Sequence, residues 1–192
     1  MGKIVLITGG SRGLGLAMAR EFGSHGATVA ICARDEAELK AAQADLARRG
    51  VRAHAFPCDI SNRDQVFRMI AEATGQLGRI DILVNNAGIL KVGPFSQMDV
   101  ADFEDAMKVM FWGPLYATLA VLPAMRARGE GGIVNITSIG GKVSMPHLLP
   151  YSCAKFAAVA LSEGLRAELA PSGIRVTTIA PGLLRTGSHL RA

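Results

Sequence analysis

Three polar residues in the last third of the chain have the types and the spacing needed to move a proton. Tyr151 and Lys155 are four residues apart in a segment with helical character, so their side chains share one helix face. An ammonium group near a phenol favours the ionised phenol, which suits general acid-base chemistry. Ser138 precedes the intervening loop 139–150, which can return the chain to the same place. Taken alone, Tyr151 would be an ordinary helix residue, Lys155 a surface cation and Ser138 a strand-end cap. Together the three residues predict a catalytic site.

A glycine-rich segment near the N-terminus has the pattern of a phosphate-binding turn. Residues 8–15 read T-G-G-S-R-G-L-G and stand between an apolar run and a helical one. A turn from a strand into a helix exposes backbone N–H groups and the positive end of the helix dipole to a phosphate. Glycine permits the tight turn and the close approach of a pyrophosphate. A plain structural turn would also use glycine, but the strand-turn-helix context favours dinucleotide binding.

The end of the second apolar run indicates which nicotinamide cofactor is preferred. An acidic residue there would hydrogen-bond the adenosine ribose and repel a 2′-phosphate. This sequence has Ala33 and Arg34 instead, with a second cation, Arg12, in the glycine-rich segment. Two guanidinium groups can pair with a phosphate through charge-assisted contacts. The pattern favours NADP(H) over NAD(H), although Arg34 would also fit a solvated strand end neutralised by Asp35.

Apolar runs alternate with helical patterns along the chain, which is typical of βαβ units around a parallel sheet. The expected strands are Lys3–Thr8, Thr28–Ala33, Arg52–Pro57, Ile82–Asn85, Gly132–Thr137 and Arg175–Ala180. The expected helices are Gly13–Ser24, Glu36–Arg49, Arg63–Leu77 with Ser61 as its N-cap, Met98–Arg128 and Tyr151–Leu169. Strands this apolar on both faces need helices on each side. We therefore predict an α/β doubly wound parallel sheet (a Rossmann fold) of at least six strands, in one domain over residues 1–192.

Composition and charge narrow the classes of function. Hydrophobic residues make up 49% and charged residues 19% of the 192 residues, as in compact α/β proteins. The net charge of +5 comes from scattered cations without a basic stripe, which argues against nucleic-acid binding. Cys32, Cys58 and Cys153 form neither a CxxC pair nor a His-Cys cluster, which favours reduced thiols and no metal site. The N-terminal apolar run is too short for a signal peptide, and prolines interrupt the uncharged stretch Val109–Met125, so we expect a cytoplasmic protein without membrane partners.

Four motifs, in order along the chain, resemble those of the short-chain dehydrogenase/reductase family in its single-domain branch. They are T-G-x-x-x-G-x-G at 8–15, N-N-A-G at 85–88, a serine at 138 ahead of Y-x-x-x-K at 151–155, and P-G at 181–182. Together they cover nearly the whole chain. The resemblance implies an NADP(H)-dependent oxidoreductase that interconverts a carbonyl and an alcohol.

The resemblance also implies a role for each motif. Tyr151 donates a proton to the carbonyl oxygen as the nicotinamide delivers hydride to the carbon, Ser138 hydrogen-bonds that oxygen, and Lys155 also holds the nicotinamide ribose. Asp59 contacts the adenine, residues 86–88 line the adenosine side, and residues 181–186 lie beside the nicotinamide. The residues expected to bind the cofactor are Thr8, Gly9, Ser11, Arg12, Gly13, Leu14, Gly15, Arg34, Asp59, Ile60, Asn86, Ala87, Gly88, Tyr151, Lys155, Pro181, Gly182 and Thr186.

Two features depart from the family pattern. The long central helix commonly carries N-x-x-G, whose Asn supports a water-mediated proton relay to the lysine, but residues 110–113 read M-F-W-G. The thioether of Met110 is a weak acceptor and cannot donate, so either water or other groups rebuild the relay or turnover is slow. Family members also usually continue past P-G-x-x-x-T into a substrate-covering lid and a last strand. This sequence stops at Ala192, and so is expected to lack them, either as a fragment or as a short form.

The substrate side is expected to be mainly apolar. The loop 140–149 (G-G-K-V-S-M-P-H-L-L) and the apolar residues of segment 89–92 would line it, although some of these residues would equally suit packing. We expect a hydrophobic ketone, aldehyde or secondary alcohol as the substrate. A lone histidine such as His147 is more typical of a loop surface than of a catalyst. The predicted pocket residues are Leu90, Gly140, Met145 and His147.

By the same resemblance we expect a homodimer or homotetramer formed through the helices 98–128 and 151–169. Two rival functions stay open. An NADP(H)-binding regulatory protein with little or no turnover would fit Met110 and the short C-terminus, while the intact Ser-Tyr-Lys set argues against it. A nucleotide-sugar epimerase or dehydratase would use the same Tyr and Lys, but that branch normally has a different glycine spacing and a larger C-terminal domain.

Overall fold

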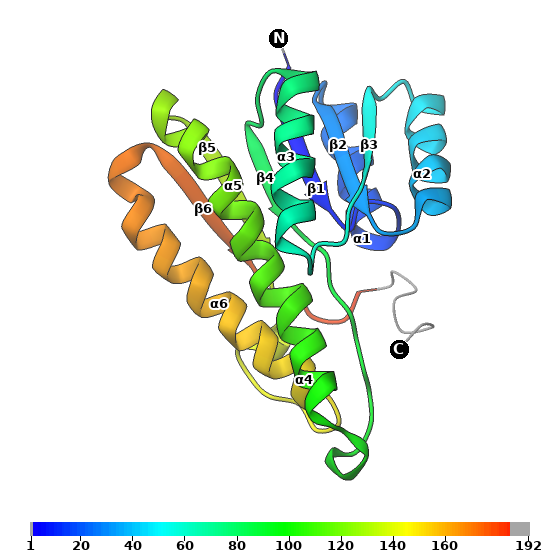
Figure 1. Ribbon diagram of the computed structural model, residues 1–192, viewed down its shortest axis with the longest axis vertical. Helices are drawn as coiled ribbons and strands as arrows, with labels where there is room; N and C mark the ends of the chain where they lie inside the picture. The colour runs from blue at the N-terminus through cyan, green and yellow to red at the C-terminus, as the bar shows by residue number, and fades with distance from the viewer. Residues whose placement is uncertain (1, 185–192) are drawn as a thin grey trace.

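A computed structural model describes residues 2–184 of the chain (Figure 1). The strands are β1 Ile4–Thr8, β2 Thr28–Ala33, β3 Ala53–Pro57, β4 Ile82–Asn85, β5 Gly131–Ile136 and β6 Ile174–Ile179. The helices are α1 Gly13–Ser24, α2 Glu36–Arg48, α3 Arg63–Leu77, α4 Val100–Met107, α5 Gly113–Arg128 and α6 Leu149–Leu169. All neighbouring strands pair in parallel, in the order β3-β2-β1-β4-β5-β6. This arrangement confirms the predicted doubly wound Rossmann fold.

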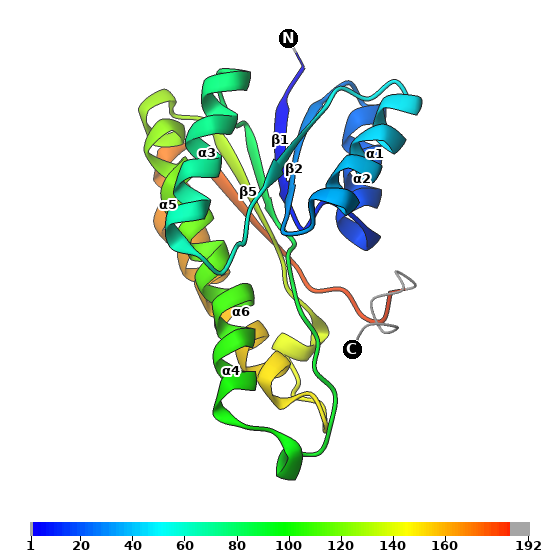
Figure 2. The same cartoon turned by 45° about the vertical axis from the view of Figure 1, so that its right-hand side comes forward.

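The alternation of side chains along β1 explains why helices lie on both faces of the sheet. Val5 and Ile7 pack on one face in a cluster that includes Leu39 of α2. Leu6 points the other way, into a cluster that includes Met125 of α5. Figure 2 shows the result, with α1 and α2 on one side of the sheet and α3, α5 and α6 on the other. Both faces of the strand are therefore buried, as the uninterrupted apolar run predicts.

The outer strand β6 is buried on one face only. Ile174 and Val176 are buried, whereas Arg175 and Thr177, which alternate with them, are exposed. The buried pair belongs to the cluster on the α3, α5 and α6 side of the sheet. Among the described strands, β6 pairs with β5 alone and forms one edge of the sheet, while β3 forms the other.

The long central helix differs from the prediction in its start and in its middle. It begins at Val100 rather than at Met98, because the Asp99 side chain caps it. The chain is helical from Val100 to Arg128, but residues 108–112 form a single π-helical turn between α4 and α5. Pro114 has no N–H to give to the Met110 carbonyl four residues earlier, so the regular α-helical hydrogen bond cannot form there. The turn holds the Met110 side chain in the interior, with 1% of its surface exposed.

One N-cap and one further helix start also differ from the prediction. The N-cap of α3 is Asn62, whose side chain accepts a 3.1 Å hydrogen bond from the Gln65 N–H. Ser61 was expected there, but its hydroxyl donates to the Asp59 carboxylate instead. The helix α6 begins two residues earlier than expected, because Pro150 is well suited to a first helical turn, where no N–H is needed.

Within residues 2–184, none of the helices combines the length and the hydropathy required to cross a membrane. In the same residues, His, Cys, Asp and Glu side chains form no group of three that could hold a metal ion. The three cysteines are free thiols, with Cys32 and Cys58 buried and Cys153 exposed. Burial raises the pKa of Cys58 to about 11, so that thiol stays protonated near neutral pH.

Candidate active site

The predicted site residues gather at the carboxyl ends of the strands. β1 pairs with β2 on one side and with β4 on the other, so the loops that leave β1 and β4 diverge toward opposite halves of the sheet. In open α/β sheets, ligands bind in the crevice outside the strands at such a reversal of order. The glycine-rich segment 8–15 follows β1, and the segment 86–88 follows β4.

The glycine-rich segment has the backbone that a phosphate site requires. Gly9 and Gly13 have φ angles of 64° and 53°, in the left-handed region that glycine adopts most readily. A Cβ added to Gly15 would lie 2.1 Å from the Gly9 carbonyl oxygen, so only glycine fits this close approach. Within residues 2–184, no side-chain hydrogen bond caps the N-terminus of α1, and its first turn contains no acidic residue. Its N–H groups are therefore oriented and uncapped, as a bound phosphate would need.

The segment after β4 is fixed directly to this loop. The Thr8 hydroxyl accepts hydrogen bonds from the N–H groups of Asn86 and Ala87, at 3.0 and 3.1 Å. The Asn86 side chain donates to the carbonyl oxygens of Thr8 and Gly9, at 2.9 and 3.1 Å. Gly88 is exposed beyond them. The two segments that the sequence assigns to the cofactor therefore form one hydrogen-bonded unit.

One residue in the helix that follows β2 was not predicted from the sequence to belong to the site. Glu38, in the first turn of α2, accepts a 2.9 Å hydrogen bond from Arg12 and a 3.1 Å hydrogen bond from the Ser11 hydroxyl. Arg34 is exposed and, within residues 2–184, forms no ion pair. Asp35 caps α2 by accepting the Glu38 N–H, at 2.9 Å, rather than pairing with Arg34. The sequence signal that could have identified Glu38 was its acidic side chain in the first helical turn after β2.

The expected adenine side lies after β3. The Asp59 carboxylate accepts hydrogen bonds from the N–H and the hydroxyl of Ser61, at 2.9 and 2.7 Å. The Asp59 N–H donates to the Gln65 side chain of α3. Ile60 is buried in the same core cluster as α3. The loop is thus held to α3 by its polar groups, with the Asp59 side chain half-buried.

Tyr151 and Lys155 lie on one face of α6, as the four-residue spacing predicts. The Lys155 nitrogen is 5.7 Å from the centre of the Tyr151 ring. It donates a 2.8 Å hydrogen bond to the Ile136 carbonyl at the end of β5. The side chain is 6% exposed, and this burial lowers the pKa of Lys155 to about 8.

Ser138 is brought to the same place by the loop that follows β5. The Ser138 hydroxyl oxygen accepts a 3.0 Å hydrogen bond from the Gly140 N–H, which leaves its own hydrogen available to another acceptor. A Cβ added to Gly140 would lie 3.2 Å from the Tyr151 ring and 3.5 Å from the Ser138 oxygen. The serine and the tyrosine therefore flank the same glycine.

A small cavity next to Lys155 contains polar groups to which the sequence analysis assigned no role. Asn85, Met110 and Asn135 line it together with Lys155, and it has room for about one water molecule. Asn85 donates to Asn135 at 2.8 Å, and Asn135 donates to the Ser162 hydroxyl at 2.9 Å. The side-chain oxygen of Asn85 is buried and has no hydrogen-bond partner in residues 2–184. Two asparagines in otherwise apolar strands were the sequence signal for this network.

The predicted substrate residues lie on two segments that contact each other. The Gly93 N–H donates to the His147 carbonyl at 3.0 Å, which joins the segment after β4 to the loop before α6. Leu90 is half-buried, whereas Met145 and His147 are exposed, and His147 has a φ of 64°. Together with Gly140 they line neither the cavity beside Lys155 nor the surface hollow described below.

The residues expected beside the nicotinamide follow β6. The Pro181 carbonyl accepts a 3.0 Å hydrogen bond from the Ile139 N–H, so this segment runs beside the loop that carries Ser138. Gly182 is exposed. Thr186 lies outside the described residues.

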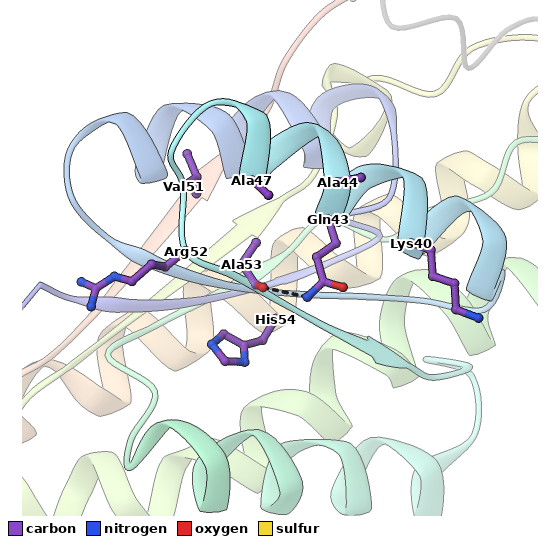
Figure 3. Close-up of a pocket in the computed structure, with 8 residues that line it drawn as sticks. All are labelled: Lys40, Gln43, Ala44, Ala47, Val51, Arg52, Ala53 and His54. Atoms are coloured by element: carbon purple, nitrogen blue, oxygen red, sulfur yellow. Dashed lines mark hydrogen bonds between the residues drawn. The ribbon is translucent and has the colours of Figure 1, made fainter.

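A surface hollow of about 610 Å³ lies at the other end of the sheet, between α2 and β3 (Figure 3). Gln43 crosses it and donates a 2.8 Å hydrogen bond to the Ala53 carbonyl of the edge strand. Lys40, Arg52 and His54 lie around its rim. None of the residues of the predicted active site lines it.

A family model and a curated relative both match this chain and agree on its family. Residues 3–190 match the family model described as short chain dehydrogenase. The dehydrogenase/reductase SDR family member 7B of Danio rerio is 36% identical over 196 residues, a match that covers 99% of this chain and 63% of the relative. The chain therefore spans less than two thirds of the length of that relative.

Two solved structures with bound cofactors are also similar. An actinorhodin polyketide ketoreductase with NADPH has a TM-score of 0.93 and 35% identity, with 96% of this chain and 72% of that chain covered. An NAD⁺-bound xylitol dehydrogenase has a TM-score of 0.91 and 31% identity, with 94% and 70% covered. One neighbour contains NADPH and the other NAD⁺, so the choice of cofactor must be argued from the residues of this chain.

Proposed function

The chain belongs to the short-chain dehydrogenase family, and we propose that it is an NADP(H)-dependent oxidoreductase that interconverts a carbonyl and an alcohol. The observation that carries the proposal is the buried Lys155 ammonium beside the Tyr151 ring, at the same sheet edge as the uncapped N-terminus of α1. A buried cation beside a phenol serves acid-base chemistry, and an uncapped helix start serves phosphate binding.

The roles follow from the chemistry of the three side chains. In the reductive direction Tyr151 donates its phenolic proton to the substrate oxygen, and in the oxidative direction it takes that proton back. Ser138 hydrogen-bonds the same oxygen, because its hydrogen is not used in the bond with Gly140. Lys155 favours the ionised phenol through its charge and has two N–H groups beyond the one that Ile136 accepts.

The residues of the glycine-rich loop fit a dinucleotide. An added Cβ would collide with backbone at Gly9 and at Gly15, and Gly13 has a φ that favours glycine, so the surface of this turn remains open to a pyrophosphate. The first turn of α1 would hold the phosphates, and Lys155 would hold the nicotinamide ribose. When bound, the nicotinamide supplies or accepts the hydride that changes the oxidation state of the substrate carbon.

The preference for NADP(H) rests on the cations at the end of β2. Ala33 and Arg34 stand where an acidic residue would favour NAD(H), and Arg12 reaches the same end of the sheet from the glycine-rich loop. The substrate that we propose is a hydrophobic ketone, aldehyde or secondary alcohol.

We further propose a homodimer or homotetramer assembled through α4, α5 and α6. Large apolar side chains stand exposed there, with Leu119 of α5 at 48%, Phe156 of α6 at 44%, and Trp112 in the turn between α4 and α5 at 43%. Apolar surface on neighbouring helices favours association. Light scattering should give a mass of two or four chains, lowered in Leu119→Arg, and a monomeric wild type would contradict the assembly.

The experiment that tests the function follows NADPH absorbance while the purified chain is mixed with a panel of hydrophobic aldehydes and ketones. Consumption that needs both protein and carbonyl supports the oxidoreductase. Tight NADPH binding without consumption of any carbonyl would favour the regulatory alternative instead.

A further inference from the structure

Glu38 contacts one of the two cations that the proposed function assigns to the cofactor phosphate. Its carboxylate joins the first turn of α2 to the glycine-rich loop, because one oxygen accepts from Arg12 and the other from Ser11. The Arg12 side chain is 56% exposed and that of Glu38 is 27% exposed, so the contact faces the solvent where a ligand can reach it. The Asp35 cap holds the backbone of Glu38 in the first helical turn.

This contact opposes the binding of a 2′-phosphate. A phosphate monoester carries about −1.5 to −2 charges near pH 7 and needs N–H and O–H donors. The glycine-rich loop offers two side-chain donors toward the end of β2, Arg12 and Ser11. The Glu38 carboxylate already accepts hydrogen bonds from both. A carboxylate at the same place also repels the phosphate.

We infer that Glu38 is a specificity-determining residue, which holds Arg12 and Ser11 in the absence of NADP(H) and gives up both donors to the 2′-phosphate when that cofactor binds. The inference rests on the proposed function, because it presumes that the adenosine half binds at the end of β2. NAD(H), which has a hydroxyl in place of the phosphate, binds without this exchange of partners. Glu38 therefore lowers the selectivity for NADP(H) that Arg12 and Arg34 create.

The acidic residues of the same helical turn provide a control. The Glu36 side chain is exposed and forms no hydrogen bond or ion pair within residues 2–184. Glu36→Gln and Glu38→Gln remove the same charge from the same turn, but only Glu38→Gln removes the carboxylate that holds Arg12. A glutamine amide accepts from arginine with about half the strength of a carboxylate, so the donors become easier to displace.

The test is calorimetric titration of the wild-type chain and both variants with NADPH and NADH, with thermal unfolding to verify that each variant folds. We expect Glu38→Gln to raise the ratio of the NADH Kd to the NADPH Kd about fivefold to tenfold, through tighter NADPH binding. In Glu36→Gln the ratio should stay within about twofold. Titration with 2′,5′-ADP and 5′-AMP should reproduce this contrast, since the two probes differ only in the 2′-phosphate.

The possible outcomes separate the inference from the proposed function. An unchanged or lower ratio in Glu38→Gln, or an equal rise in Glu36→Gln, would overturn the role of Glu38 while NADPH binding still supports the proposed cofactor. A wild-type chain that binds neither NADPH nor NADH would contradict the proposed function, and the inference would fail with it.

Discussion

The Lys155 ammonium lies 5.7 Å from the centre of the Tyr151 ring while it donates to the carbonyl oxygen of Ile136 at the end of β5. This contact fixes α6 to the sheet at the residue where the loop toward Ser138 begins. The lysine is almost completely buried, and desolvation lowers its pKa from an ordinary value of 10.5 to about 8. The fold thus keeps a cation in the interior at the cost of stability, next to the phenol that we assign to proton transfer.

The first prediction concerns the pH dependence of folding. Because the pKa of Lys155 is lower in the folded chain, the unfolded chain binds more protons between about pH 8 and 10.5, so stability rises with pH in that window. Relative to Lys155→Met, the wild type should gain up to about 3 kcal/mol in free energy of unfolding from pH 7 to pH 10.5. Urea unfolding of both proteins at several pH values measures this difference. A difference that does not change with pH would contradict the assignment.

The second prediction uses two helical glycines in different surroundings. Alanine at Gly15 would place its Cβ 2.1 Å from the Gly9 carbonyl oxygen, whereas nothing lies within 4 Å of the corresponding position at Gly75 in α3. We expect Gly15→Ala to destabilise the fold by about 1–3 kcal/mol and to weaken NADPH binding. Gly75→Ala should stabilise it by about 0.5–1 kcal/mol and leave binding unchanged. Equal effects of both substitutions on NADPH binding would show that the close approach at Gly15 does not matter to the cofactor.

The third prediction addresses Met110, which replaces the asparagine of the family pattern. Asn85 and Lys155 line the cavity beside the Met110 side chain, and the Asn85 oxygen there has no partner in residues 2–184. These groups can hold a water molecule without a polar side chain at position 110. We therefore expect Met110→Asn to change kcat by no more than about twofold between pH 6 and 9. A large rise in kcat would mean instead that the wild-type relay is broken and turnover is slow.

Much of the fold follows from local pattern. Apolar runs such as that of β1 are long enough for a strand and too short for a helix, and both faces of β1 prove to be buried. The strand bounds differ from the prediction by at most one residue at either end. Because parallel strands end at one edge, the motifs that follow β1, β4 and β5 had to meet there.

Other features depend on contacts that sequence spacing does not encode. The π-helical turn at residues 108–112 results from the missing N–H of Pro114, and the Val109–Met125 pattern alone does not distinguish it from a regular helix. The contact between Glu38 and Arg12 joins the glycine-rich loop to α2 across 26 residues. Neither the π-helical turn nor this contact produces a repeating pattern in the sequence, so neither could be predicted from it.

The most direct test of the central claim compares the two tyrosines of the chain. Tyr116, on α5, stacks on Trp112 at 6.0 Å and has no role in the proposed chemistry. With a carbonyl substrate identified from the panel, we would measure kcat and the NADPH Kd of Tyr151→Phe and Tyr116→Phe. We predict that Tyr151→Phe lowers kcat about 100-fold or more while the NADPH Kd stays within about twofold, and that Tyr116→Phe changes neither. Unchanged turnover in Tyr151→Phe would contradict the assignment of Tyr151 as the proton donor.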